Sequence, residues 1–344
     1  IRCCIRASRT RSTCCAPSLS EWLSSREIQR LDVTSKRGVL LSLALTRVQA
    51  LAPEAIRIGL SATVADPDAL RAWLVPSGTP VAPLIMGKPG APPNIRILKS
   101  VERVPWSGHS SIYAIPEVYA EIKKAKMTLV FVNTRSQAEM IFQALWEANE
   151  DNLPIALHHG SLDVAQRRKV EAAMGEGRLR AVVCTSSLDL GVDFQPVERV
   201  VQIGSAKNVA RLLQRAGRSA HCPGGTSQVL FMPTNALELL EVSAMRRGLE
   251  NGLVEHRRPP QLPLDVLLQH LTSLACGPGL HPEQELDSVR SCWSFRQLSN
   301  AQWRWCLTFL EHGGECLGAY PRYHKLVRDG DVYRVVDKTI ARLH

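Results

Sequence analysis

Three arginines stand close together in the segment NVARLLQRAGRSAHCPGG, which covers residues 208–225 and contains a pair of glycines at its end. They are Arg211, Arg215 and Arg218. Arg215 and Arg218 are three positions apart, so on a helix they share one face and can reach a common anion. The segment is either an ordinary basic helix in solvent or a set of guanidinium groups directed at a phosphate. The elements around it decide between these interpretations.

Strands and helices alternate on both sides of the arginines. Apolar runs of strand length are MTLVFVN, PIALHH, LRAVVCT, ERVVQIG and SQVLFMP. Helical patterns are RSQAEMIFQALWEA, KNVARLLQRA and NALELLEVSAMRRGL, and a further helix begins at Asp163 as its N-cap, with Gln166 three residues later. This alternation predicts an α/β fold of right-handed βαβ units around a mainly parallel sheet. In such sheets ligands bind beyond the carboxyl ends of the strands.

Polar residues follow three of these strands at the positions where a ligand is expected. The segments are FVNTR, HHGSL and TSSLDLGVDF. Hydroxyl groups and backbone N–H groups at helix N-termini suit phosphates. The polar residues and glycines in question are Asn133, Thr134, Arg135, His159, Gly160, Ser161, Thr185, Ser186, Asp189, Gly191 and Asp193.

The flanking segments predict further elements. Residues 35–51 have helical spacing, IRIGL at 56–60 is a buried strand that leads into Ser61 and Thr63, and Asp66 caps a helix that starts with Pro67. The proline-rich stretch 75–94 is a linker. From residue 253 onward, helices and a hairpin with an Asp-Gly turn indicate a winged helix.

Two tryptophans lie in the second of those C-terminal helices, SNAQWRWCLTFLEHGG. Trp303 and Trp305 are two positions apart and therefore point in different directions on a helix. At least one of them is expected in the core, and the other is a candidate for stacking on a nucleic-acid strand.

Composition restricts the function classes. The chain has 344 residues and a net charge of +10, which favours a polyanionic partner such as nucleic acid. No apolar run is long enough to cross a bilayer, so no membrane role is expected. The ten cysteines include no C-x-x-C pair and are expected to be reduced thiols, and His158 and His159 lack a third metal ligand nearby. The first 20 residues contain four arginines and no acid, which is typical of an organellar transit segment or of a mistranslated start.

Five motifs occur in an order that resembles a known family. LSAT, FVNTRSQAE, HHGSL, TSSLDLGVDF and LLQRAGRSAH follow the order of the later motifs of superfamily 2 helicases. From about residue 35 to 344 the chain is similar to the Lhr-type helicases, particularly the ligase-associated DEXH-box group. The resemblance implies a remnant of a first RecA-like domain at 35–88, a second RecA-like domain at 89–252 and a winged helix at 253–344. Residues 1–34 are unmatched.

The resemblance also implies a mechanism and roles for residues. It implies an ATP-dependent helicase that uses ATP and Mg²⁺, moves along single-stranded DNA in DNA repair, and has DNA ligase and nuclease partners, in the cytoplasm if bacterial. Arg218 would be the arginine finger with Arg215 beside it, and Gln214, Gly191 and Asp193 would lie at the nucleotide. Ser61 and Thr63 would couple nucleotide state to strand grip. The strand phosphates would be contacted by Thr134, Arg135, Gly160, Ser161, Thr185 and Ser186.

Two departures from the family pattern keep a second hypothesis open. The sequence contains no G-x-x-x-x-G-K-[ST] and no D-E-x-H; the stretch just before SKRG is EIQRLDVT, residues 27–34. Ala220 stands where the family usually has glycine. The alternative to a helicase part is therefore a non-catalytic nucleic-acid-binding module that lacks ATPase activity. A P-loop and an acidic box upstream in the gene would favour the helicase.

Overall fold

The structure is a computed structural model of the whole chain. It describes residues 33–53, 55–60, 66–86, 91–108, 110–189, 197–219, 226–255, 258–337 and 339–340, together with the backbone of 2–6. The chain divides into two compact units. The sheet unit consists of residues 62–65 and 86–256, and the helical unit consists of residues 1–61, 66–85 and 257–344. Each unit is described by itself.

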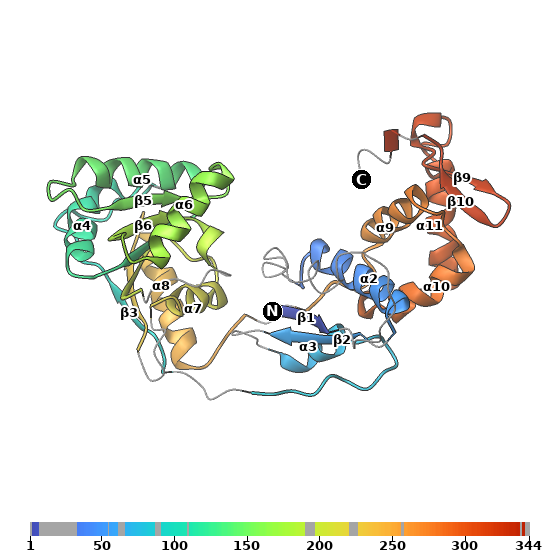
Figure 1. Ribbon diagram of the computed structural model, residues 1–344, viewed down its shortest axis with the longest axis horizontal. Coiled ribbons are helices and arrows are strands. Elements are labelled where there is room, and N and C mark those ends of the chain that lie inside the picture. Colours follow the sequence, from blue (N-terminus) through green and yellow to red (C-terminus); the bar gives the residue numbers. More distant parts are fainter. Residues whose placement is uncertain are drawn as a thin grey trace. The chain divides into compact units, whose positions relative to one another are not determined.

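The sheet unit is built around six strands that are all parallel, in the order β3-β8-β7-β4-β6-β5 (Figure 1). This confirms the predicted parallel sheet. Because every strand runs in the same direction, the residues that follow the strands gather at one edge. The strands are β3 (Asn94–Ile97), β4 (Thr128–Phe131), β5 (Ile155–His158), β6 (Ala181–Cys184), β7 (Arg199–Ile203) and β8 (Gln228–Met232).

Helices cover both faces of this sheet, which is why its strands are continuous apolar runs. Along β4, Leu129 and Phe131 belong to the core shared with α6, α7 and α8, whereas Val130 belongs to the core shared with α4 and α5. The helices are α4 (Ile115–Lys123), α5 (Arg135–Glu147), α6 (Val164–Gly175), α7 (Val209–Ala216) and α8 (Leu237–Glu250).

Side-chain caps fix the start of three of these helices. Thr134 accepts a hydrogen bond from the backbone N–H of Gln137 at the start of α5, Asp163 accepts one from Ala165 in α6, and Asn208 accepts one from Arg211 in α7. The predicted cap at Asp163 is confirmed. Each cap follows a strand by a few residues, so it also fixes where the chain leaves the sheet edge.

The helical unit contains a three-helix and hairpin arrangement, α9 (Leu264–Cys276), α10 (Pro282–Ser291), α11 (Asn300–His312), β9 (Leu326–Asp329) and β10 (Val332–Val335). This confirms the expected winged helix. Trp303 is only 4% exposed and lies in its core, so the prediction that at least one of the two tryptophans is buried is confirmed. Trp305 is 51% exposed.

The segment before the linker packs against these helices. Val39 and Leu43 of α2 (Lys36–Leu51) share the core of the winged helix. The unit also contains α3 (Pro67–Leu74), which Asp66 caps as predicted, and an antiparallel pair of β1 (Arg2–Arg6) with β2 (Ile56–Leu60). The strand at 56–60 is thus confirmed, but its predicted burial is wrong, because Ile56 and Ile58 are 59% and 42% exposed. Residues 75–86 and 91–93 contain no helix or strand, as expected of a linker.

Four strands and α-helices have no counterpart among the predicted ones. β1 lies in the unmatched first residues, β3 lies directly after the prolines of the linker, and α4 and α10 each have a proline in their first two positions, in segments without a clear pattern. Within the part of the chain that the structure describes, no helix is both long and apolar enough to cross a bilayer.

Candidate nucleotide and nucleic-acid interface

The carboxyl edge of the sheet brings together most of the residues that the sequence predicts for nucleic-acid binding. After β4 come Thr134 and Arg135, after β5 come Gly160 and Ser161, and after β6 comes Ser186, and all five are exposed. Thr185, by contrast, is buried. We call the exposed set, together with Asn133, the strand-end rim.

Neighbouring members of the rim are in direct proximity. A Cβ atom added to Gly160 would lie 3.9 Å from Nη2 of Arg135, so the segments after β4 and β5 adjoin each other. Gly160 therefore presents bare backbone beside a guanidinium group. Bare backbone and a cation are the two features with which a protein surface accepts a phosphate without reading a base.

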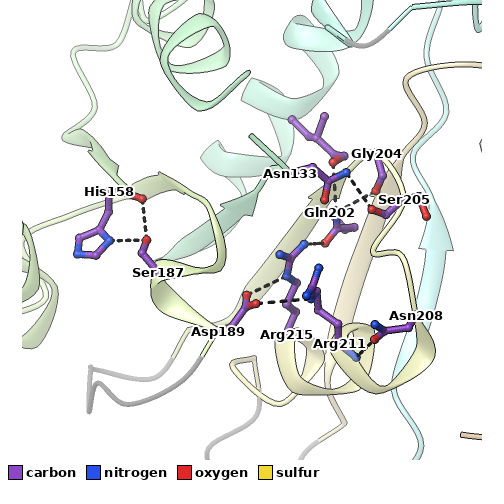
Figure 2. A network of polar contacts seen from close by, with 11 residues as sticks. Asn133, His158, Ser187, Asp189, Gln202, Gly204, Ser205, Asn208, Arg211 and Arg215 are labelled. Atoms are coloured by element: carbon purple, nitrogen blue, oxygen red, sulfur yellow. Dashed lines mark hydrogen bonds and ion pairs between the residues drawn. The ribbon is translucent and has the colours of Figure 1, made fainter. Parts of the chain in front are cut away.

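The rim continues across β7 through hydrogen bonds to backbone atoms. Asn133 donates from Nδ2 to the carbonyl oxygen of Ser205 at 2.9 Å (Figure 2). Gly204 has a φ of +74°, and an added Cβ would lie 3.1 Å from that same nitrogen. The carboxylate of Glu238 accepts from the backbone N–H groups of Ser205 and Thr234, at 3.0 and 2.7 Å. The ends of β4, β7 and β8 are thus fixed to one another.

Arg215 lies inside the sheet unit, below the rim. Its side chain is 1% exposed, its Nε donates to Oδ1 of Asp189 at 2.9 Å, and its Nη1 donates to Oε1 of Gln202 at 2.6 Å (Figure 2). The guanidinium carbon is 4.7 Å from the centroid of the Phe131 ring. Gln202 donates onward from Nε2 to the carbonyl oxygen of Gly204 at 2.9 Å. A buried guanidinium with these partners ties α7, the segment after β6 and the end of β7 together.

Arg218 lies beyond the end of α7, so the expectation that Arg215 and Arg218 share one helix face is wrong. The helix ends at Ala216 with Gly217 as its C-cap, and the backbone N–H of Arg218 donates to the carbonyl oxygen of Arg215 at 3.0 Å. Arg218 is half-buried, whereas Arg215 is enclosed. The sequence places the two three residues apart, but the structure gives them different surroundings.

The remaining arginine of the segment is more exposed than Arg215. Arg211 has a side chain that is 41% exposed, with Nε 4.0 Å from Oδ2 of Asp189. Asp189 thus faces two guanidinium groups, one enclosed and one at the surface.

The first turn of α7 carries two caps. Besides Asn208, the carboxylate of Glu255 accepts from the backbone N–H of Val209 at 2.5 Å and of Ala210 at 3.2 Å. A negative charge at a helix N-terminus is stabilising. Glu255 follows α8 near the end of the sheet unit. The N-terminus of α7, the helix that carries Gln214 and Arg215, is therefore held by two side chains, Asn208 and Glu255.

His158 at the end of β5 forms a second buried polar cluster. Ser187 in the 3₁₀ turn Ser186–Leu188 donates its hydroxyl hydrogen to the carbonyl oxygen of His158 at 2.9 Å, and its Oγ lies 2.7 Å from Nδ1 of the same residue (Figure 2). The donor and acceptor roles of Nδ1 and Oγ in this contact depend on the tautomer of the imidazole. Nε2 lies 3.4 Å from Oε1 of Glu171.

Serine, histidine and a carboxylate are the types of a hydrolytic triad, but this geometry excludes that chemistry. The hydroxyl of Ser187 is buried together with the imidazole of His158 and hydrogen-bonds to the backbone carbonyl of that histidine, so a substrate carbonyl cannot reach it. The cluster instead joins the segments after β5 and β6, which carry Gly160 and Ser186. Sequence reasoning considered His158 only as a metal ligand and missed this role.

Several expected site residues lie outside the described residues. They are Gly191 and Asp193 near the nucleotide, Ser61 and Thr63 as coupling residues, and Ala220. Among the described ranges of both units, no group of three potential metal ligands occurs. The thiol of Cys184 at the end of β6 is free, and burial holds its pKa well above the ordinary value, so it is not a nucleophile at neutral pH.

Two domain families match the sequence of this chain. Residues 111–222 match the helicase conserved C-terminal domain, and residues 247–344 match the winged helix domain of the large helicase-related protein. This chain carries the helicase C-terminal domain and the winged helix of the Lhr-type superfamily 2 helicases. The first match includes β4 to α7 and therefore the whole strand-end rim, together with Arg215 and Arg218.

The sequences of two relatives agree with this assignment. The ATP-dependent helicase Lhr-Core protein 2 of Thermococcus barophilus is 32% identical over 322 residues, covering 88% of this chain and 36% of the relative. The Lhr helicase/uracil glycosylase of Escherichia coli is 32% identical over 311 residues, covering 77% of this chain and 20% of the relative. The chain thus spans about a third of the length of the Lhr-Core relatives.

A solved structure supports the Lhr-type fold. The Mycobacterium smegmatis helicase Lhr bound to single-stranded DNA and AMP-PNP matches with a TM-score of 0.79 and 29% identity, over 90% of this chain and 40% of that chain. The predicted fold class, a RecA-like parallel-sheet domain with a winged helix, is therefore confirmed.

Proposed function

We propose that the sheet unit is the strand-gripping and nucleotide-sensing part of an ATP-dependent DNA translocase. The observation that carries this proposal is the strand-end rim, where Arg135 and the bare backbone of Gly160 adjoin at the carboxyl edge of a parallel sheet. Ser161 and Ser186 add exposed hydroxyl groups along the same edge. These groups fix phosphates in position and do not discriminate between bases.

The nucleotide side of the proposal rests on Arg218. It lies at the end of α7, whose position is fixed by Arg215 from within and by Asn208 and Glu255 at its N-terminus. Because α7 is fixed in this way, the half-buried guanidinium group of Arg218 has a defined position. Such a group suits contact with a γ-phosphate, which an arginine finger stabilises during hydrolysis. Arg215 acts in this scheme by holding α7, and Gln214 lies on the same helix.

ATP needs further ligands that this sequence does not supply. The sequence has no phosphate-binding loop and no acidic box, and the described residues include no cluster of acids that fits Mg²⁺. In the proposed function this chain therefore contributes Arg218 to the nucleotide and assigns no residue of its own to Mg²⁺. When bound, ATP and Mg²⁺ would supply the energy of translocation.

A second function is favoured by the same sequence observation. Without those two motifs, the chain as it stands binds single-stranded DNA and hydrolyses ATP negligibly. A phosphate-release assay with single-stranded DNA separates the two, because turnover of about 1 s⁻¹ or faster by this chain contradicts the non-catalytic alternative. A role in DNA repair, DNA ligase and nuclease partners and membership of the ligase-associated group stay predictions.

The rim is tested by comparing two arginines at opposite edges of the sheet. Arg135 is exposed at the carboxyl edge, whereas Arg178 is exposed in the segment before the amino end of β6. Arg135→Ala should weaken binding of a labelled oligothymidine and lower the slope of log affinity against log salt by about 0.7, the contribution of one phosphate contact. Arg178→Ala removes the same charge and should change neither quantity appreciably.

The measurement is fluorescence anisotropy of the whole chain at two salt concentrations. For the unmodified chain, a fourfold rise in salt should weaken binding about tenfold or more. Equal effects of the two substitutions would mean that net charge, rather than the rim, attracts the strand. Binding that is indifferent to salt would contradict the phosphate contacts altogether.

A further inference from the structure

Trp106 is the most exposed tryptophan among those that the structure describes, with 85% of its surface accessible. It lies in the sheet unit between β3 and α4. An indole ring carries a large apolar surface, and an isolated domain gains nothing from leaving it in water. The position of the backbone beneath the ring shows what the ring can reach.

The backbone on both sides of Trp106 is held against the end of β8. The carbonyl oxygen of Pro105 accepts from the backbone N–H of Ala236 at 2.9 Å. A Cβ added to Gly108, which has a φ of +144°, would lie 3.6 Å from the carbonyl oxygen of Thr234. The backbone that carries Trp106 is therefore held at the carboxyl edge of the sheet.

Two side chains further along this segment secure it to the same strand end. The hydroxyl groups of Ser111 and Tyr113 both donate to the carbonyl oxygen of Pro233, at 3.1 and 2.7 Å. Burial, followed by the nearby carboxylates of Glu238 and Glu117, raises the pKa of Tyr113 to about 12, so its phenol remains a donor throughout the neutral range. Ser111 is buried and has a φ of 54°.

The end of β8 is continuous with the strand-end rim. Gly204 at the end of β7 is the link, because a Cβ added there would meet Cγ2 of Thr234 at 3.3 Å and Nδ2 of Asn133 at 3.1 Å. Asn133 is followed directly by Thr134 and Arg135. An unbroken row of contacts thus leads from the backbone beside Trp106 to the rim.

We propose that Trp106 stacks on an unpaired base of the single-stranded DNA that runs along the strand-end rim. The rim offers hydroxyl groups, backbone and a guanidinium, all of which suit phosphates, but it offers no surface for a base. A solvent-exposed indole at one end of the row supplies that surface, and stacking tolerates any base because every base has a π-face. This inference rests on the proposed strand path.

The first test compares variants of the whole chain for affinity toward a labelled oligothymidine. Trp106→Ala should weaken binding between about 5-fold and 100-fold, and Trp106→Phe should recover most of the loss. Because no phosphate contact is removed, the slope of log affinity against log salt should stay unchanged. The matched control is Trp146→Ala, since Trp146 on α5 is also 60% exposed; it should bind like the unmodified chain.

The second test locates the stacked base. A series of oligothymidines with one abasic site at each position in turn should show one position or two adjacent ones where the unmodified chain loses affinity. Trp106→Ala should be insensitive to the abasic site at that position, while its midpoint of thermal unfolding should match that of the unmodified chain.

The outcomes separate this inference from the proposed function. In one outcome, Trp106→Ala leaves the affinity unchanged while the unmodified chain binds the strand with the expected salt dependence. That result overturns the stacking role and leaves the strand path intact. The exposed ring would then serve a protein contact. An altered salt slope in Trp106→Ala also overturns it, because the loss would then come from a disturbed rim. Failure of the unmodified chain to bind overturns the strand path and the stacking role together.

Discussion

The sheet unit and the helical unit bury different kinds of side chain. In the sheet unit the buried groups include the guanidinium of Arg215 and the carboxylates of Asp189 and Glu238, all close to the carboxyl edge. Among the described residues of the helical unit, the buried polar side chains are Ser42, Thr46, His270, Thr272 and Ser294, none of which is a carboxylate or a guanidinium.

This difference indicates that the sheet unit must meet a structural requirement besides stable packing. Burying a charge is unfavourable unless it is paired and hydrogen-bonded, so a fold that only needs stability avoids it. The sheet unit accepts that cost below the rim, where the ends of β4, β6, β7 and the helix α7 must keep fixed relative positions. The winged helix is held mainly by apolar contacts, and His270 is the one titratable side chain among the five buried polar side chains of the helical unit named above.

The largest expected effect lies at Arg218. In a longer version of the protein that supplies the phosphate-binding and acidic motifs, Arg218→Ala should lower the rate of ATP hydrolysis by about 10³-fold to 10⁵-fold. DNA affinity and the free energy of unfolding should change little, because the residue is half-buried beyond the end of α7. Steady-state phosphate release measures the rate, anisotropy measures the DNA affinity, and urea unfolding measures the free energy of unfolding.

Arg218→Lys sharpens this prediction, since lysine keeps the charge but not the planar fork of donors. It should recover only part of the rate. A loss of DNA affinity as large as the loss of rate would place Arg218 on the strand instead of the nucleotide.

The next largest effect concerns the buried guanidinium. Arg215→Ala should lower the free energy of unfolding by about 3–5 kcal/mol, because it leaves Asp189 buried without its partner. Urea unfolding followed by circular dichroism measures this. Arg211→Ala is the matched control in the same chain, since its side chain is 41% exposed and its Nε is 4.0 Å from the same carboxylate; it should cost less than about 1 kcal/mol. Similar costs for both would mean that Asp189 is not enclosed.

These two arginines show what the sequence could and could not predict. The alternation of strands and helices was sufficient for a parallel sheet, and a parallel sheet is sufficient to bring Thr134, Gly160 and Ser186 to one edge. The depth of a side chain below that edge is a different matter. Arg215 is enclosed because α7 packs on the sheet beside Asp189 and Gln202, which lie 26 and 13 positions away in the sequence.

The missed residues have the same physical cause. His158 and Ser187 are 29 positions apart and meet only because β5 and β6 are neighbours in the sheet. Trp106 carried no signal, because a single tryptophan in a loop has no periodicity that could indicate exposure. In the helical unit, by contrast, the two-residue spacing of Trp303 and Trp305 was enough to predict that one is buried.

The smallest effect tests the helical unit through its buried histidine. Burial, followed by the charge of Arg47, lowers the pKa of His270 from 6.5 to about 4. The folded state therefore keeps His270 neutral while the unfolded chain takes up a proton below pH 6.5. Its contribution to stability is complete above pH 6.5 and is lost as the pH falls from 6.5 to 4, by about 3 kcal/mol in total.

Urea unfolding at several pH values, followed by tryptophan fluorescence to which the buried Trp303 contributes, measures this loss. His270→Leu removes the titrating group and should flatten the dependence between pH 6.5 and 4, whatever its effect on stability at pH 7. The exposed His312 provides the control, because His312→Leu should leave the dependence in place. The carboxyl group of Asp265, whose pKa is lowered by its hydrogen bond from Lys36, loses its contribution only below its ordinary value of 3.8, outside this window. An unchanged slope in His270→Leu would mean that water reaches His270, and the interior of the winged helix would then be less apolar than the comparison with the sheet unit requires.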